Sequence, residues 1–294
     1  MADIRSFSSA FCCEPSVAHN RFLASCDHRR ITVKKNTTAW IIFFVLLVST
    51  TNIYPQATPI QRDQKALAIL AQTILSGGGV DLLTSIKDLT ETGAVTYYFD
   101  DQTTGTVTTK SRGLRQFKLE ADLSIGKRTV IVNGSGGSLR DENGGTWPID
   151  RQSAADIGSM IFPYLPLIAA VQDSSTKITY GGLVTHNGAS VHDIRIERTY
   201  TSQQDPTVAR GTQEARDIYI DPTSLQVVAI FDQFHSGGAV DNGIPHEILY
   251  SNYQSENGIA VPLSISETMR GETRVTIQQS SVTFNTGLAD SDFE

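Results

Sequence analysis

The hydrophobic and polar residues of this chain follow two different periods. Apolar residues recur at helical spacing over 64–76 and over 80–86, and a run of three glycines that begins at Gly77 separates the two stretches. From residue 89 onward apolar and polar residues alternate instead, as they do in VTYYF at 95–99. Side chains repeat every 3.6 residues in an α-helix and every two residues in a strand. The pattern therefore predicts two short N-terminal helices followed by a long succession of strands.

The alternating stretches predict about 11 strands, separated by turn-forming pairs such as Asn187-Gly188, Asp221-Pro222 and Asn257-Gly258. The expected strands are 95–99, 105–109, 117–123, 129–132, 176–185, 189–200, 213–221, 224–234, 245–253, 259–270 and 272–285. The turn-rich stretch between 134 and 145 leaves open one more short strand at 138–140. Short connections between sequence neighbours indicate antiparallel pairing, and a sheet this large must curl.

A strongly apolar segment, 153–172, interrupts the strands. Pro163 and Pro166 prevent it from forming one regular helix, so we expect short helical pieces with apolar surfaces. An antiparallel sheet usually has one apolar face and one wet face. The predicted fold class is α+β: a curved antiparallel sheet forms a half-barrel, and short helices cover its concave apolar face.

The N-terminal part of the chain resembles a secretory signal. Lys34 and Lys35 precede ten consecutive apolar residues, 39–48, and a polar run with a small residue at Ala57 follows. A membrane-spanning helix needs about 20 apolar residues, which favours a cleaved signal over a retained N-terminal anchor. We expect a leader at 1–33, a signal or anchor at 34–57 that is cleaved near Ala57, and one domain at 58–294. The expected location is the periplasm or cell envelope.

The leader itself has two interpretations. It is an unstructured extension, or it lies upstream of a true translation start near Val33. Cys12, Cys13 and Cys26 all precede the apolar run, so a mature chain has no cysteine for a disulfide, a nucleophile or a metal. From residue 58 onward the chain holds 18 Lys and Arg against 28 Asp and Glu, a net charge of −10. Such a charge argues against a nucleic-acid partner.

Residues with catalytic or metal-binding potential do not form a known motif. The histidines after the apolar run, His186, His192, His235 and His246, have no HxxxH, HxH or HExxH spacing. No GxSxG nucleophile motif is present, and no Lys-Ser or Lys-Thr pair follows the triple glycine as a phosphate-binding loop requires. We therefore predict no catalytic residues, no metal and no cofactor.

Four segments resemble the LolA-like family of periplasmic lipoprotein carriers. They are TGTVTTKSRGLRQFKLE at 104–120, DIYIDPTSLQVVAI at 217–230, YSNYQSENGIAVP at 250–262 and QQSSVTFNTGLADSDF at 278–293. The order of N-terminal helix, four strands, apolar insert and further strands is also similar, so the resemblance spans about 64–293. It implies a half-barrel whose apolar cavity shields acyl chains beneath a helical lid.

The predicted inner face and apolar insert supply the candidate cavity and lid residues, and the resemblance adds one more residue. The cavity would be lined by Val95, Tyr97, Phe117, Leu119, Ile194, Ile196, Leu263 and Ile265. The lid would contain Ile157, Met160, Phe162, Leu165 and Ile168. Carriers have an arginine at the end of the second strand that holds the lid closed, and Arg112 matches its position. Gly113 stands where carriers usually have proline, and Lys110 and Arg115 are alternatives for the latch.

The expected function is a non-catalytic carrier that binds lipid or lipoprotein acyl chains, with a partner protein in the inner or outer membrane. The alternative is a membrane-tethered lipid-sensing or interaction module of the same fold, of the envelope-stress type. A retained anchor would favour that alternative, because a shuttle must leave its membrane. A hydrolase is disfavoured by the missing nucleophile and metal motifs.

Overall fold

The computed structural model describes residues 60–98, 102–134, 136–149, 157, 162–199, 213–234 and 243–294. The predictions for the leader and the signal segment, and for Met160 and His235, lie outside these residues. Residues Ala57–Glu294 cluster as one compact unit. Within the described part of the chain, no helix has the length and apolar character needed to cross a membrane.

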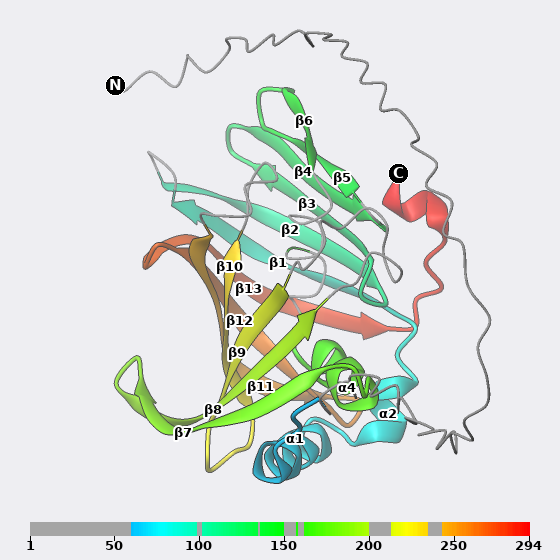
Figure 1. Ribbon diagram of the computed structural model, residues 1–294. Helices are drawn as coiled ribbons and strands as arrows, with labels where there is room; N and C mark the ends of the chain where they lie inside the picture. The colour runs from blue at the N-terminus through cyan, green and yellow to red at the C-terminus, as the bar shows by residue number, and fades with distance from the viewer. Residues whose placement is uncertain are drawn as a thin grey trace, which may run out of the picture. The chain divides into compact units, whose positions relative to one another are not determined.

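One antiparallel sheet contains 13 strands and forms the frame of the domain (Figure 1). The first six strands are β1 (Asp88–Tyr98), β2 (Gln102–Arg112), β3 (Gln116–Leu123), β4 (Gly126–Asn133), β5 (Gly136–Arg140) and β6 (Thr146–Ile149). The other seven are β7 (Lys177–His186), β8 (Ala189–Thr199), β9 (Gln213–Ile220), β10 (Val227–Phe234), β11 (Ile244–Glu256), β12 (Ile259–Met269) and β13 (Glu272–Phe284). These are two meanders, β1–β6 and β7–β13, in which each strand pairs with its sequence neighbour.

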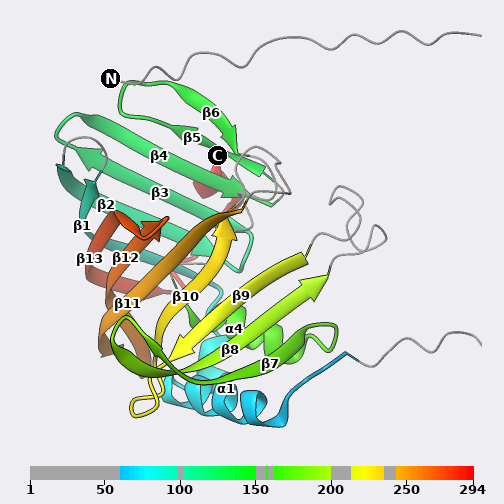
Figure 2. The ribbon, with the colours of Figure 1, turned by 60° about the vertical axis from the view of Figure 1, so that its left-hand side comes forward.

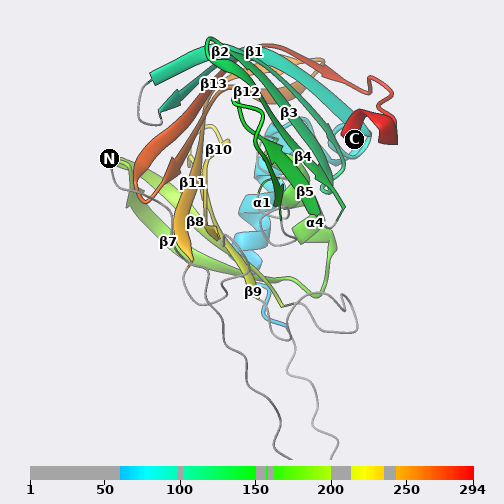
Figure 3. The same cartoon turned by 90° about the horizontal axis from the view of Figure 1, so that it is seen from above.

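The two meanders join through a single ladder, between β1 and β13. The order of strands runs from β6 through β1 and β13 to β7, so β6 and β7 are the two edges and the sheet is open. Figures 2 and 3 show that the sheet curves around the helices, which lie on its concave side. The predicted half-barrel of a curved antiparallel sheet with short helices is confirmed.

Irregularities in the strand ladders accompany this curvature. The register shifts at Thr92/Gly93 between β1 and β13, and at Tyr180/Gly182 between β7 and β8. Such bulges increase the local twist of a strand and bend it. At the first of them only glycine fits, because a Cβ on Gly93 would lie 2.2 Å from the carbonyl oxygen of Gln278 on β13.

Three α-helices are described: α1 (Gln64–Ser76), α2 (Val80–Thr84) and α4 (Tyr164–Gln172). A short 3-10 helix, η1 (Asp290–Phe293), lies near the C-terminus. The carboxylate of Asp63 caps α1 by accepting hydrogen bonds from the backbone N–H groups of Lys65 and Ala66. The helix predicted at 64–76 is confirmed. In α4, Pro166 lies in the first turn, where the lost N–H has no partner within the helix anyway, so a short regular helix forms.

The sheet has two more strands than the 11 that the sequence predicted. β5 includes the stretch that the sequence left open at 138–140, whereas β6 directly follows the turn-rich stretch 134–145, at a place where no strand was predicted. Proline cannot donate to a strand ladder, but β6 is an edge strand, so Pro148 is tolerated there.

The buried apolar side chains form two clusters. The first, called the sheet cluster below, combines α1 and Leu167 of α4 with residues from both meanders. The second, called the helix cluster, combines the end of α1, α2 and α4 with one end of β1, β12 and β13. The helix cluster consists of Ile74, Leu83, Ile86, Leu89, Phe162, Tyr164, Ile168, Ile259, Val261 and Val282.

Candidate functional site

The eight residues predicted to line a cavity all belong to the two apolar clusters on the concave face. Six of them are buried in the sheet cluster: Val95, Tyr97, Phe117, Leu119, Ile194 and Ile265. Ile196 is partly buried against the sheet cluster, and Leu263 is partly buried against the helix cluster. Alternation along each strand brings them to one face. The structure therefore places these residues together on the concave face. Their role in contacting a ligand stays a prediction.

The described residues of the predicted lid also pack on the concave face. Phe162 and Ile168 are buried and Leu165 is partly buried in the helix cluster, whereas Ile157 packs against the sheet cluster. The ring of Phe162 lies 5.8 Å from that of Phe284 on β13, centroid to centroid. This part of the chain thus covers apolar strands, and whether it opens stays a prediction.

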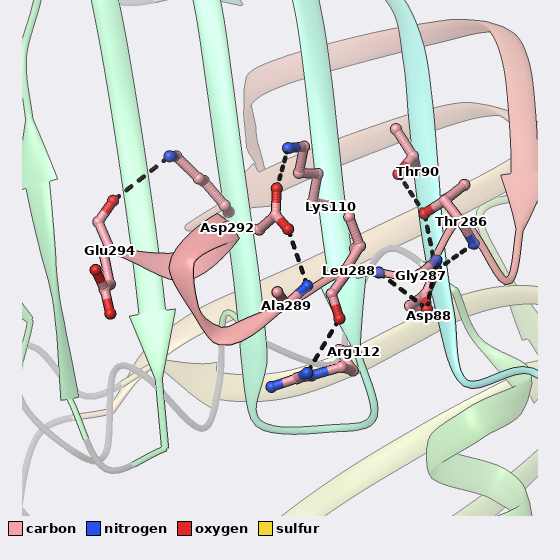
Figure 4. Close-up of polar contacts among 11 residues, drawn as sticks. Asp88, Thr90, Lys110, Arg112, Thr286, Gly287, Leu288, Ala289, Asp292 and Glu294 are labelled. Carbon is pink, nitrogen blue, oxygen red and sulfur yellow. Dashed lines mark hydrogen bonds and ion pairs between the residues drawn. The ribbon is translucent and has the colours of Figure 1, made fainter.

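The structure does not bring Arg112 to the described residues of the predicted lid, and its role as a latch stays a prediction. Arg112 lies on the convex face, where its guanidinium donates to the backbone oxygen of Leu288 at 3.1 Å (Figure 4). The same guanidinium also pairs with Asp290. The physical reason is strand alternation: Phe117 on β3 faces the core, so its partner Ser111 does too, and Arg112 faces away. Of the two alternatives, Lys110 pairs with Asp292 at 2.6 Å on the same convex face and Arg115 is exposed in a turn.

The partner of Arg112 is the C-terminal segment 285–294, called the strap below. Asp88 holds its start by accepting from the backbone N–H and hydroxyl of Thr286 and from the N–H groups of Gly287 and Leu288 (Figure 4). Phe293 is only 1% exposed near the end of the strap. Asp290 and Asp292 of the strap pair with Arg112 and Lys110, which are distant in the chain, so the local sequence does not show that this segment is held to the sheet.

A charged cluster on the concave face was not predicted. It joins Arg216, Asp232, His246 and Glu267 from the four adjacent strands β9 to β12. The imidazole nitrogens of His246 contact Asp232 Oδ1 at 2.8 Å and Glu267 Oε1 at 3.1 Å. Burial works against the charged imidazole, but the hydrogen bonds to Asp232 and Glu267 outweigh it and raise the pKa of His246 to about 9.

The chemistry open to His246 is limited by these two contacts. An imidazolium whose two N–H groups both donate to carboxylates has no lone pair with which to accept a proton from a nucleophile. Among the side chains that the structure describes, no group of three or more His, Cys, Asp and Glu is arranged to hold a metal ion. The cluster is therefore suited to polar contacts and to holding four strands together.

A second polar group, called the seam triad below, lies near the ladder that joins the meanders. Thr109 Oγ1 on β2 donates to Glu91 Oε2 on β1 at 2.6 Å, and Gln279 Nε2 on β13 donates to Glu91 Oε1 at 2.8 Å. All three side chains are buried. Burial raises the pKa of Glu91 to about 7, although both hydrogen bonds act in the opposite direction.

Arg128 of β4 adds a third polar contact to the concave face. Its guanidinium carbon lies 5.0 Å from the centroid of the Tyr97 ring, and its NH2 nitrogen lies 3.2 Å from a carboxylate oxygen of Glu142. The concave face therefore combines a large apolar area with a few charged and hydrogen-bonding groups. Such a combination is typical of sites for small amphipathic molecules.

No protein-family model matches the chain, and no curated protein sequence matches it. Solved structures do resemble it, each with a TM-score of 0.47. An outer membrane lipoprotein-sorting protein domain from Vibrio parahaemolyticus is 14% identical, with 78% of this chain and 96% of that chain covered. A DUF1329 family protein from Desulfovibrio piger is 13% identical, with 81% of this chain and 98% of that chain covered. A LolA superfamily protein from Nitrosomonas europaea is 10% identical, with 78% of this chain and 97% of that chain covered. The structures similar to this chain thus include LolA-like proteins, the family that its sequence resembles.

Proposed function

We propose that this chain is an exported, non-catalytic carrier that binds lipid or lipoprotein acyl chains against the concave face of its sheet. The observation that supports the proposal best is the open, curved sheet, in which one apolar cluster spans both meanders. The two edge strands, β6 and β7, do not pair with each other, so they can move apart without breaking a strand ladder.

The energetics of such binding need no catalytic residue. Each methylene removed from water contributes about 0.8 kcal/mol. About 14 buried methylenes would therefore contribute roughly 11 kcal/mol before the cost of ordering the ligand is subtracted. Apolar side chains of β1, β3, β8 and β12 supply the contact area in this proposal, and they are the predicted lining residues.

Access would involve α4 and the connection that precedes it. Phe162 and Ile168 cover apolar strands through the helix cluster, and α4 contacts α1 and α2 rather than forming hydrogen bonds within the sheet. Arg62 donates to the backbone oxygens of Ala170 and Val171 at the C-terminal end of α4, whereas Tyr164 and Ile168 nearer its N-terminal end pack in the helix cluster. We propose that this segment is the lid, and that movement of α4 exposes the concave face to an acyl chain.

The first test is uptake of a fluorescent fatty acid by the purified domain. Leu263→Glu places a carboxylate among apolar side chains of the concave face, and we expect the affinity to fall at least tenfold because burying a charge there is costly. Ser264→Glu, one residue further on β12 and on the opposite face, is the matched control and should bind within twofold of the wild type. Thermal melting of each variant checks that it is folded. A folded wild type that takes up no probe would refute the proposal.

Export is the second part of the proposal. We expect native mass spectrometry of the protein from its own host to give a mass that starts near Thr58 and to include bound lipid. A mass that retains residues 34–57 would contradict a free carrier and would favour the membrane-tethered sensor.

A further inference from the structure

The seam triad interrupts an otherwise apolar part of the concave face. On β1, Glu91 stands between Leu89, which belongs to the helix cluster, and Val95, which belongs to the sheet cluster. On β13, Gln279 stands likewise between Val282 of the helix cluster and Ile277 of the sheet cluster. The triad therefore lies where the two apolar clusters meet, and also where the two meanders join.

The hydrogen bonds within the triad leave one strong acceptor unused. Each oxygen of the Glu91 carboxylate accepts one hydrogen bond, from Thr109 and from the side-chain N–H of Gln279. The Oε1 atom of Gln279 has no hydrogen-bond partner in the part of the chain that the structure describes. Gln279 is only 8% exposed, so water reaches this oxygen poorly.

An unused acceptor in such a place is costly. A buried polar group without a partner lowers stability by about 1–3 kcal/mol, which is why nearly all such groups are satisfied. An apolar side chain at position 279 would avoid that cost, as Ile277 and Val282 do on the same strand. The acceptor would be satisfied by a ligand that brings a hydrogen-bond donor with its acyl chain.

We propose that the seam triad is a binding subsite for a hydroxyl group of an amphipathic ligand, with Gln279 Oε1 as the acceptor. This inference rests on the proposed function, because the acyl chain must bind to the concave face for its hydroxyl group to reach the triad.

The composition of the triad decides which donor fits. A phosphate or a carboxylate would meet the Glu91 carboxylate with no cation among the three side chains. An ammonium group could pair with Glu91, but both Glu91 oxygens already accept from Thr109 and Gln279, and the other ammonium donors would lose their hydration among apolar clusters. A hydroxyl group is neutral and has the single donor that Gln279 Oε1 requires.

The test compares two ligands with the same acyl chain. Monoolein has two free hydroxyl groups, whereas methyl oleate has none, and both are titrated against a bound fluorescent fatty acid. We expect the wild type to prefer monoolein about tenfold, the ratio that corresponds to about 1.4 kcal/mol for one hydrogen bond to a buried group.

Two neighbouring glutamines provide the matched variants. Gln279→Met keeps the length of the side chain and removes its polar atoms, so the preference for monoolein should fall to within twofold of unity. Gln278→Met changes the exposed neighbour, which contacts Ser264 on the other face, and should keep the preference of the wild type. A preference that survives in folded Gln279→Met would overturn the subsite.

A second measurement needs no variant. In the wild type, the side-chain amide NMR signal of Gln279 should shift when monoolein is added and stay in place with methyl oleate. Equal binding of the two ligands, or an unmoved Gln279 signal, would refute the subsite and leave the carrier proposal intact. If neither ligand displaces the probe and the probe itself does not bind, both proposals fail.

Discussion

The imidazole of His246 is 2% exposed between two carboxylates, and its pKa rises from 6.5 to about 9 on folding. A raised pKa stabilises the native state fully below pH 6.5, where both states hold the proton, and this contribution is lost as the pH rises to about 9. We expect the free energy of unfolding to fall over that range by at most about 3 kcal/mol from this residue. Urea denaturation between pH 6 and pH 9 measures the decrease.

The variant His246→Gln identifies the source of that decrease. It removes the titrating group, so the gap in stability between variant and wild type should be largest at pH 6 and should narrow toward pH 9. Gln254→Ala, at an exposed position on the same strand β11, removes no titratable group, so it is the control and should leave the pH dependence as it is. A gap that stays constant across the range would contradict the ionic role of His246.

The titration of Glu91 also lowers the stability of the native state as the pH rises, but over a lower pH range than that of His246. Its pKa rises from 4.5 to about 7, so the native state favours the protonated carboxyl, and this contribution to stability is lost between pH 4.5 and pH 7. Tyr250 on β11 interacts electrostatically with Glu91. It stays neutral over this pH range because burial raises its pKa. We therefore expect Glu91→Gln to be more stable than the wild type at pH 8, by about 1–3 kcal/mol.

Denaturation at pH 5 and pH 8 measures this difference. Glu120→Gln, on the convex side of β3 beside Lys127, is the matched control and should change the stability by less than about 0.5 kcal/mol at either pH. If Glu91→Gln and the wild type lose stability equally between the two pH values, then Glu91 does not titrate in the native state.

The strap shows how an element without regular pairing is held to the sheet. Asp88 is 5% exposed and accepts hydrogen bonds from three consecutive backbone N–H groups, those of Thr286, Gly287 and Leu288. Asp88→Ala would leave these donors without their acceptor, so we expect the free energy of unfolding to fall by about 1–3 kcal/mol. The amides of 286–288 should also exchange their hydrogens faster.

A ligand-binding measurement tests whether the strap and the concave face act independently. Lys110 and Arg112 hold the strap on the convex side, so Asp88→Ala should bind the fatty-acid probe within twofold of the wild type. Asp122→Asn is the control, because the Asp122 side chain is 69% exposed and should affect neither property. A large loss of probe binding in a folded Asp88→Ala would show that the strap and the concave face are coupled.

Helices and strands could be predicted where residues close together in the sequence determine them. The helix at 64–76 has its apolar period, its capping Asp63 and its terminal glycines within one short stretch. β6 was missed because its identity as a strand depends on pairing with β5, while its own sequence, TWPI, contains a proline. The contacts of Arg112 with the strap could not be predicted, because they depend on where the C-terminal segment lies against β2.

The polar groups of the concave face could not have been predicted in the same way. Gln279 and Glu91 are 188 positions apart, and only the ladder between β1 and β13 brings them together. His246, Asp232 and Glu267 similarly require the register of three strands at once. Glu91, Glu267 and Gln279 each have polar neighbours on both sides in the sequence, so no alternation of apolar and polar residues marks them as facing the core.

At the scale of the whole molecule, the ladder between β1 and β13 also determines the order in which the chain can fold. The pairs within each meander are local, whereas Asp88 and Thr286 at the end of this ladder are 198 positions apart. Closing so long a loop costs entropy that local hairpins do not, so this ladder is the slowest part of the sheet to form. When the chain is delivered N-terminus first, β1 has an unpaired edge until β13 arrives. During that interval the first meander is an open template for aggregation, and the last strand of the protein is the one that closes it.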